Sequence, residues 1–169
     1  MTTPKLTITA PRTASDLRIG RLVHRWLRSK RIPAELSFDG ANVRISMPYR
    51  HAGDIGVALD ASTAWSMRAA DERPLPPLYR SGVRYAREPL CRIDGREHMC
   101  KEFTTAHETL RRGKGDCDDL GPWRASELRL AGEPAQAFAR RSKAGWHVVV
   151  RRSDGLIEDP SAKLGMPTR

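Results

Sequence analysis

The chain lacks any apolar run close to the roughly 20 residues that a membrane-spanning helix requires, so we expect no membrane partner. Its first residues, Met1 to Lys5, also lack the apolar core of a secretory signal, and we therefore expect the protein to be cytoplasmic, at least at first. Cysteine is scarce. Its odd count of 3 argues against a disulfide framework and indicates reduced thiols. The 169 residues suffice for one core, or for one domain with a small appendage.

Acidic residues are outnumbered, with 20 Asp and Glu against 30 Lys and Arg, which gives a net charge of +10. A positive surface favours nucleic acid, acidic proteins or anionic polymers without selecting among them. Four arginines recur three and four positions apart on one face of an expected helix: Arg18, Arg21, Arg25 and Arg28. A solvated helix face is the default interpretation of this stripe. The arginines could instead bind phosphates or an acidic protein, and the lack of interleaving aromatic residues weakens a single-strand nucleic-acid interpretation.

The first 70 residues follow the pattern of a small, basic βαββα module of unknown role. We expect a strand over 6–9, a helix from Ser15, its N-cap, to Ser29, and a second helix over 52–69. The apolar stripe of the first helix is Ile19, Leu22, Val23 and Trp26.

Between these helices, residues 34–38 and 41–45 alternate like the two strands of a hairpin. The dipeptide Asp39-Gly40 predicts a two-residue turn between them. The resulting cross-strand pairs are Phe38 with Ala41, Leu36 with Val43, and Glu35 with Arg44.

Residues 71–77 contain three prolines, which can neither continue a helix nor pair within a sheet, and they mark the expected boundary between domains at 1–70 and 71–169. Beyond the boundary we expect an irregular stretch at 78–86, a loop at 91–95, helices at 105–112 and 117–130, and strands at 135–140, 145–152 and 156–159.

A cysteine, a histidine and an aspartate then follow one another, each in a different kind of element. Cys117 opens a helix that Asp116 caps, His147 lies within a strand, and Asp159 ends the next strand. A thiol nucleophile, its general base and the carboxylate that orients the base require these residue types. The helix start favours a thiolate at Cys117, whereas the neighbouring acidic residues oppose its ionisation.

The turn between the last two strands tests this hypothesis. A two-residue loop at Asp154-Gly155 would pair Val150 with Asp159 and place His147 on the other side of the sheet. A three-residue loop at 153–155, with Gly155 left-handed, pairs Val149 with Asp159 and brings His147 to the same face as Asp159. A catalytic triad therefore predicts the three-residue loop.

Four segments carry a resemblance to a known family: 115–120 (Gly-Asp-Cys-Asp-Asp-Leu), 132–135 (Gly-Glu-Pro-Ala), 146–150 (Trp-His-Val-Val-Val) and 158–161 (Glu-Asp-Pro-Ser). Residues 76–166 resemble the transglutaminase-like superfamily, and the whole chain looks most like small members encoded by tailed phages. The resemblance implies an α+β fold with a transglutaminase-like (papain-like) core, in which the cysteine helix packs on an antiparallel sheet. It also implies that Cys117, His147 and Asp159 are the nucleophile, base and orienting acid.

On that basis we expect a cysteine peptidase, amidase or acyltransferase that acts on a peptide or protein through a thioester. The alternative is a virion or assembly protein that keeps the fold with secondary or vestigial activity, in the host cytoplasm or associated with the virion. Many family members carry a tryptophan upstream of the nucleophile as an oxyanion donor, and this chain has none between Trp65 and Trp123. Tyr79 and Tyr85 are the candidates for that role.

A zinc site is a further possibility that the spacing disfavours. Cys91, His98, Cys100 and His107 follow the pattern Cys-x6-His-x-Cys-x6-His. Structural zinc ligands instead come as close pairs on tight turns. We therefore expect neither a metal nor another cofactor.

Overall fold

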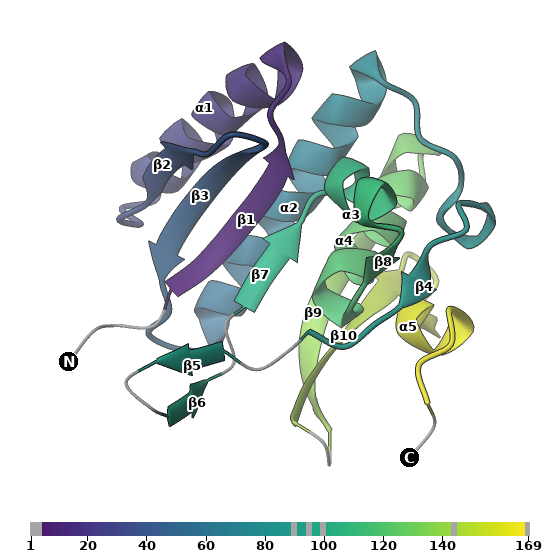
Figure 1. Ribbon diagram of the computed structural model, residues 1–169. Helices are drawn as coiled ribbons and strands as arrows, with labels where there is room; N and C mark the ends of the chain where they lie inside the picture. The colour runs from purple at the N-terminus through teal and green to yellow at the C-terminus, as the bar shows by residue number, and fades with distance from the viewer. Residues whose placement is uncertain (1–4, 89–90, 94–95, 99–100, 143–144, 168–169) are drawn as a thin grey trace.

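The computed structural model describes residues 5–88, 91–93, 96–98, 101–142 and 145–167, and it has a mixed α+β fold (Figure 1). In this part of the chain, no helix combines the length and the apolar character needed to cross a membrane. The elements of the first half are β1 (Lys5–Pro11), α1 (Ala14–Ser29), β2 (Glu35–Phe38), β3 (Asn42–Pro48) and α2 (Ala52–Glu72).

The order of these five elements confirms the predicted βαββα module. Helix α1 starts one residue before the expected cap, because the Thr13 side chain accepts a hydrogen bond from the Asp16 amide at 3.1 Å. Trp26 was wrongly placed in the apolar stripe. It is 40% exposed, and Leu27 is fully buried in its stead. The four predicted arginines are exposed on the outer face of α1.

Helices α1 and α2 pack closely with β3 at Gly20. A Cβ on this residue would lie 2.8 Å from the Trp65 ring and 3.1 Å from Val43. Trp65 also donates to Asp16 Oδ1 at 3.0 Å, and Arg73 reaches Asp16 Oδ2 at 2.6 Å. The ends of α1 and α2 are therefore joined around one buried carboxylate.

The predicted register of the β2–β3 hairpin is wrong by two residues. Phe38 pairs with Val43 rather than Ala41, and Glu35 pairs with Ser46 rather than Arg44. The cause is the Asp39 carboxylate, whose Oδ1 accepts from the amides of both Ala41 and Asn42, at 3.1 and 2.8 Å, and holds a longer loop. Gly40 does not have the positive φ that a two-residue turn of this type needs.

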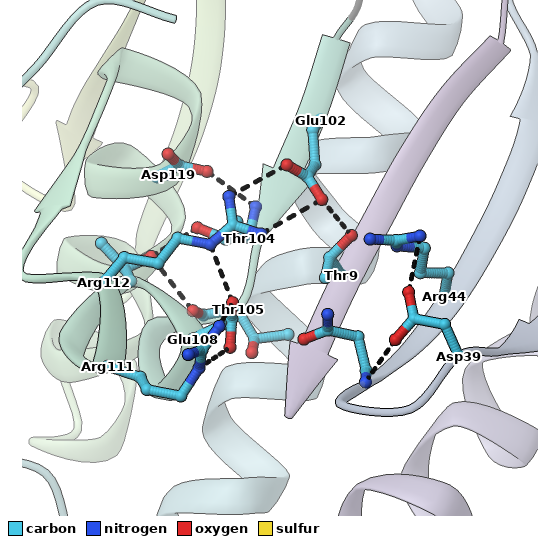
Figure 2. Close-up of polar contacts among 12 residues, drawn as sticks. Thr9, Asp39, Arg44, Glu102, Thr104, Thr105, Glu108, Arg111, Arg112 and Asp119 are labelled. Atoms are coloured by element: carbon cyan, nitrogen blue, oxygen red, sulfur yellow. Dashed lines mark hydrogen bonds and ion pairs between the residues drawn. The ribbon is translucent and has the colours of Figure 1, made fainter. Parts of the chain in front are cut away.

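This loop predicts opposite responses at two neighbouring residues. Asp39→Ala removes both side-chain bonds to the loop amides as well as the 2.7 Å ion pair with Arg44 (Figure 2), so the melting temperature is expected to fall by a few degrees. Gly40→Ala is expected to be nearly neutral, since its Cβ would meet nothing within 4 Å. Thermal unfolding followed by circular dichroism measures both. A large loss on Gly40→Ala alone would indicate the two-residue turn instead.

The expected domain boundary separates the two halves in sequence but not in space. The elements beyond it are η1 (Leu78–Arg80), β4 (Arg84–Tyr85), β5 (Cys91–Ile93), β6 (Arg96–His98), β7 (Lys101–Thr104), α3 (Ala106–Arg112) and β8 (Lys114–Gly115). Strand β7 pairs in parallel with β1 and completes a mixed sheet of order β2-β3-β1-β7. One hydrophobic core contains residues of both halves, among them Ile8, Trp65 and Val148.

The second half confirms the predicted helices and the three final strands. They are α4 (Cys117–Leu130), β9 (Ala135–Ser142), β10 (Gly145–Arg152), β11 (Ile157–Glu158) and a short α5 (Pro160–Lys163). The strands form an antiparallel sheet of order β11-β10-β9, and α4 packs between this sheet and α2. The loop expected at 91–95 is instead strand over 91–93, which pairs with β6.

Candidate active site

Cys117 is the first residue of α4, at the N-terminus where the sequence placed it. Asp116 caps the helix by accepting from the Asp118 amide at 3.0 Å, and the Asp119 carboxylate accepts from the Asp116 amide at 3.1 Å. The other oxygen of Asp119 accepts from the Thr104 amide of β7 at 2.6 Å (Figure 2). The start of the cysteine helix is thus fixed to the edge of the first sheet.

A network of charges surrounds this junction (Figure 2). Glu102 of β7 accepts from Thr9 of β1 at 2.6 Å and pairs with Arg112 of α3 at 2.9 Å. Arg112 also reaches the fully buried Glu108 at 2.8 Å. These bonds tie β1, β7 and α3 into the frame that carries the cysteine.

Gly121, one turn after Cys117, sets how closely α4 approaches β10. A Cβ at this position would lie 2.7 Å from Val148 Cγ1. The close approach brings the thiol to the strand backbone, where the Val148 amide acts to lower the pKa of Cys117. Cys117 therefore lies against the residue that follows His147.

The loop between β10 and β11 is the three-residue loop that the triad predicted. Arg152 N donates to Leu156 O at 2.9 Å, and Gly155 has a φ of 82°. Val150 pairs with Glu158 and Arg151 with Ile157, which is the register that the three-residue loop requires. The prediction of this register is confirmed.

His147 and Asp159 meet as the hypothesis requires. His147 Nε2 and Asp159 Oδ2 are 2.7 Å apart, and both side chains are mostly buried. Asp159 also caps α5, since its Oδ1 accepts from the Ala162 amide at 3.1 Å. One carboxylate oxygen of Asp159 thus accepts from the backbone of α5, and the other contacts the imidazole. Because this contact uses Nε2 of His147, Nδ1 is the ring nitrogen left for a second contact.

A helix N-terminus favours the thiolate form of a cysteine, but the other surroundings of Cys117 oppose its ionisation. Cys117 is 8% exposed, and burial, with the nearby carboxylates of Asp118 and Asp116, raises the pKa of its thiol above the ordinary value. The amide of Val148 and the ammonium of Lys101 act to lower the thiol pKa, but burial and the two carboxylates have the larger effect. Between the two described residues Cys117 and His147, the structure contains no hydrogen bond.

Lys101 of β7 is a part of the site that the sequence did not indicate. Its ammonium lies 2.8 Å from Asp118 Oδ2 and 3.9 Å from Asp116 Oδ2. Burial alone would lower the pKa of Lys101, but these two carboxylates raise it. Burial and the adjacent acids raise the pKa of Asp116, and they raise that of Glu88 to about 8.

The acidic cluster is largely engaged by protein groups, although Asp118 Oδ1 is buried without a hydrogen-bond partner. One oxygen each of Asp116, Asp118 and Asp119 lies within 4.8 Å of the others. Lys101 already neutralises Asp118, however, and backbone amides occupy Asp116 and Asp119. Of the zinc candidates, Cys100 and the side chains of Cys91 and His98 lie outside the described residues. The side chain of His107 contacts the Arg73 carbonyl at 2.8 Å.

The two tyrosines proposed as oxyanion donors differ in their surroundings. The Tyr79 hydroxyl donates to Glu158, so it is not free to donate to a substrate. Tyr85 pairs with Gly115, two residues before Cys117. Burial raises the pKa of Tyr85, and Cys117 and Asp116 raise it further. Tyr85 therefore stays the candidate.

Glu158 is a second residue that sequence reasoning passed over. It is buried beside Asp159 and accepts from Arg124 at 2.9 Å and from Lys163 at 3.1 Å, in addition to Tyr79. This network fixes the end of β11 and hence the position of Asp159. In the sequence, the position of Glu158 directly before Asp159 was the signal that could have identified it.

Comparisons of the chain with protein-family models, curated proteins and solved structures found no match.

Proposed function

We propose that the protein is a thiol-dependent acyl-transfer enzyme that acts on an amide bond, with Cys117 as nucleophile, His147 as base and Asp159 as the orienting acid. The 2.7 Å contact between His147 Nε2 and Asp159 Oδ2 carries the proposal. It is supported by the placement of Cys117 at a helix start against the Val148 amide. A cysteine helix packed on an antiparallel sheet is also the arrangement that the transglutaminase-like resemblance implies.

The raised pKa of the thiol determines the order of proton transfer. Since the raised pKa favours the protonated thiol, Nδ1 of His147 takes the proton of Cys117 as the sulfur attacks the carbonyl carbon. Asp159 stabilises the resulting imidazolium. The imidazolium then protonates the departing amine and leaves a thioester, which water or a second amine resolves. The Cys117 amide, unpaired within its own helix, and the Tyr85 hydroxyl are the proposed oxyanion donors.

Alkylation kinetics test the proposal without a known substrate. In a Cys91→Ser/Cys100→Ser background, where Cys117 is the remaining thiol, the rate with iodoacetamide is measured from pH 6 to pH 9. His147→Ala is expected to slow the reaction several-fold near neutral pH, because the base is lost, and Asp159→Asn to slow it less. His51→Ala, which removes an exposed histidine at the start of α2, is the control. Equal rates in the His147 and His51 variants would contradict the proposal.

The burial of Cys117 and its raised thiol pKa favour one other function, a virion or assembly protein that retains this fold without its chemistry. In that case Cys117 would react as an isolated, protected thiol whose rate His147 does not affect. The same alkylation series therefore separates the two functions.

A further inference from the structure

The outer face of α1 is a row of arginines whose charges are mostly unpaired. Arg18, Arg21, Arg25 and Arg28 are all exposed, on the side opposite the buried Ile19, Val23 and Leu27. Arg18 pairs with Glu72 of α2. Within the described part of the chain, no carboxylate lies within ion-pair distance of Arg21, Arg25 or Arg28.

The row ends at a basic groove. A hollow of about 310 Å³ is lined by Arg28, Arg31, Ile32, Pro33 and Arg50. It brings together the end of α1, the connection to β2 and the residues before α2. Three arginines, two at the end of α1 and one before α2, thus border one hollow, and in the described residues no acidic side chain pairs with Arg31 or Arg50. We call this hollow, with Arg21 and Arg25 beside it, the basic groove.

Arg31 occupies a position where glycine would be expected. Helix α1 ends in a Schellman turn, with the Ile32 amide donating to Leu27 O at 3.1 Å and the Arg31 amide to Arg28 O at 3.0 Å. Arg31 is the left-handed residue of this turn, with a φ of 59°. A side chain in this conformation is strained and glycine is not, so the turn itself does not account for an arginine there.

We propose that the basic groove binds the phosphate backbone of duplex nucleic acid, independently of the Cys117 site. Planar guanidinium groups fit phosphate oxygens bidentately. The basic groove offers five such groups, on Arg21, Arg25, Arg28, Arg31 and Arg50. Figure 1 places α1 on the opposite side of the molecule from α5, where Asp159 lies. Trp26 of the same helix is 40% exposed, but one aromatic side chain is not the series of stacking platforms that successive unpaired bases require, which favours a duplex over a single strand.

Salt-dependent binding of a fluorescent 20-base-pair duplex tests the proposal. The wild-type chain is expected to bind with a steep dependence on salt. Arg28→Gln/Arg31→Gln/Arg50→Gln is expected to weaken binding roughly tenfold at 0.1 M salt and to reduce the log–log salt slope by about 2 to 3. The matched control, Arg140→Gln/Arg141→Gln/Arg151→Gln, removes the same charge from the exposed arginines of β9 and β10 and is expected to lose much less.

Arg31→Gly tests duplex binding in a variant whose loss of binding could not be due to unfolding. It is expected to weaken binding while leaving the melting temperature unchanged or higher, because glycine relieves the strained conformation. Equal losses in the two triple variants would show attraction by net charge alone and overturn the proposal. So would tight binding of polyglutamate, which would identify an acidic protein as the partner, or the absence of duplex binding by the wild type at 50 mM salt.

Discussion

Asp118→Asn is expected to speed alkylation of Cys117 at pH 7.5 by roughly tenfold or more. The Asp118 carboxylate is one of the two charges that raise the pKa of the thiol, after burial itself. It also holds the Lys101 ammonium at 2.8 Å. The substitution removes a negative charge beside the sulfur and leaves the positive charge of Lys101 free to act on it. Both changes lower the thiol pKa, so a larger fraction of Cys117 is thiolate at neutral pH.

The measurement is the second-order rate with iodoacetamide across pH, in the background where Cys117 is the remaining thiol. Lys101→Met is expected to change the rate in the opposite direction, because it removes a charge that lowers the thiol pKa. Asp71→Asn, at an exposed residue near the end of α2, controls for the loss of one carboxylate. A rate in Asp118→Asn that matches Asp71→Asn would show that burial alone suppresses the thiolate.

Two of the three Asp-Gly dipeptides of the chain, at 39–40 and 154–155, show what the sequence could and could not predict. Both suggest two-residue turns, and neither forms one. At Asp154-Gly155 the requirement that His147 reach Asp159 selected the three-residue loop, which the structure contains. At Asp39-Gly40 no such requirement existed, and the side chain of Asp39 bonds two loop amides in a longer turn. Local turn chemistry alone did not determine the strand register at either dipeptide. The requirement that His147 reach Asp159 determined it at Asp154-Gly155.

The residues of the candidate site also divide into those that the sequence could predict and those that it could not. Cys117, His147 and Asp159 were predictable because each stands in a local pattern: a capped helix start, a strand and a strand end. Lys101 was not, because it reaches Asp118 only once β7 pairs with β1 and lies beside α4. The protonation state of the thiol depends on that tertiary arrangement. Helix position alone favours a thiolate, whereas burial and two carboxylates prevail.

Gly121→Ala is expected to destabilise the protein by about 1–3 kcal/mol, although alanine is the better helix former. The new Cβ would lie 2.7 Å from Val148 Cγ1, closer than packed atoms can approach, and Val148 is buried and stiff at its β-branched side chain. Helix α4 must therefore shift from β10. Because Cys117 lies one turn before Gly121, the shift also withdraws the thiol from the Val148 amide that helps to stabilise its charged form.

Urea unfolding of four variants separates this contact from helix propensity. Gly56→Ala in α2 is the matched control. Its Cβ would meet nothing within 4 Å, so it is expected to gain up to about 1 kcal/mol. Val148→Ala opens the space that the new methyl group needs. The double variant Gly121→Ala/Val148→Ala is therefore expected to be more stable than the sum of the single losses predicts. Strict additivity, or a Gly121→Ala chain as stable as Gly56→Ala, would mean that α4 does not rest on Val148 and that the close approach does not position Cys117.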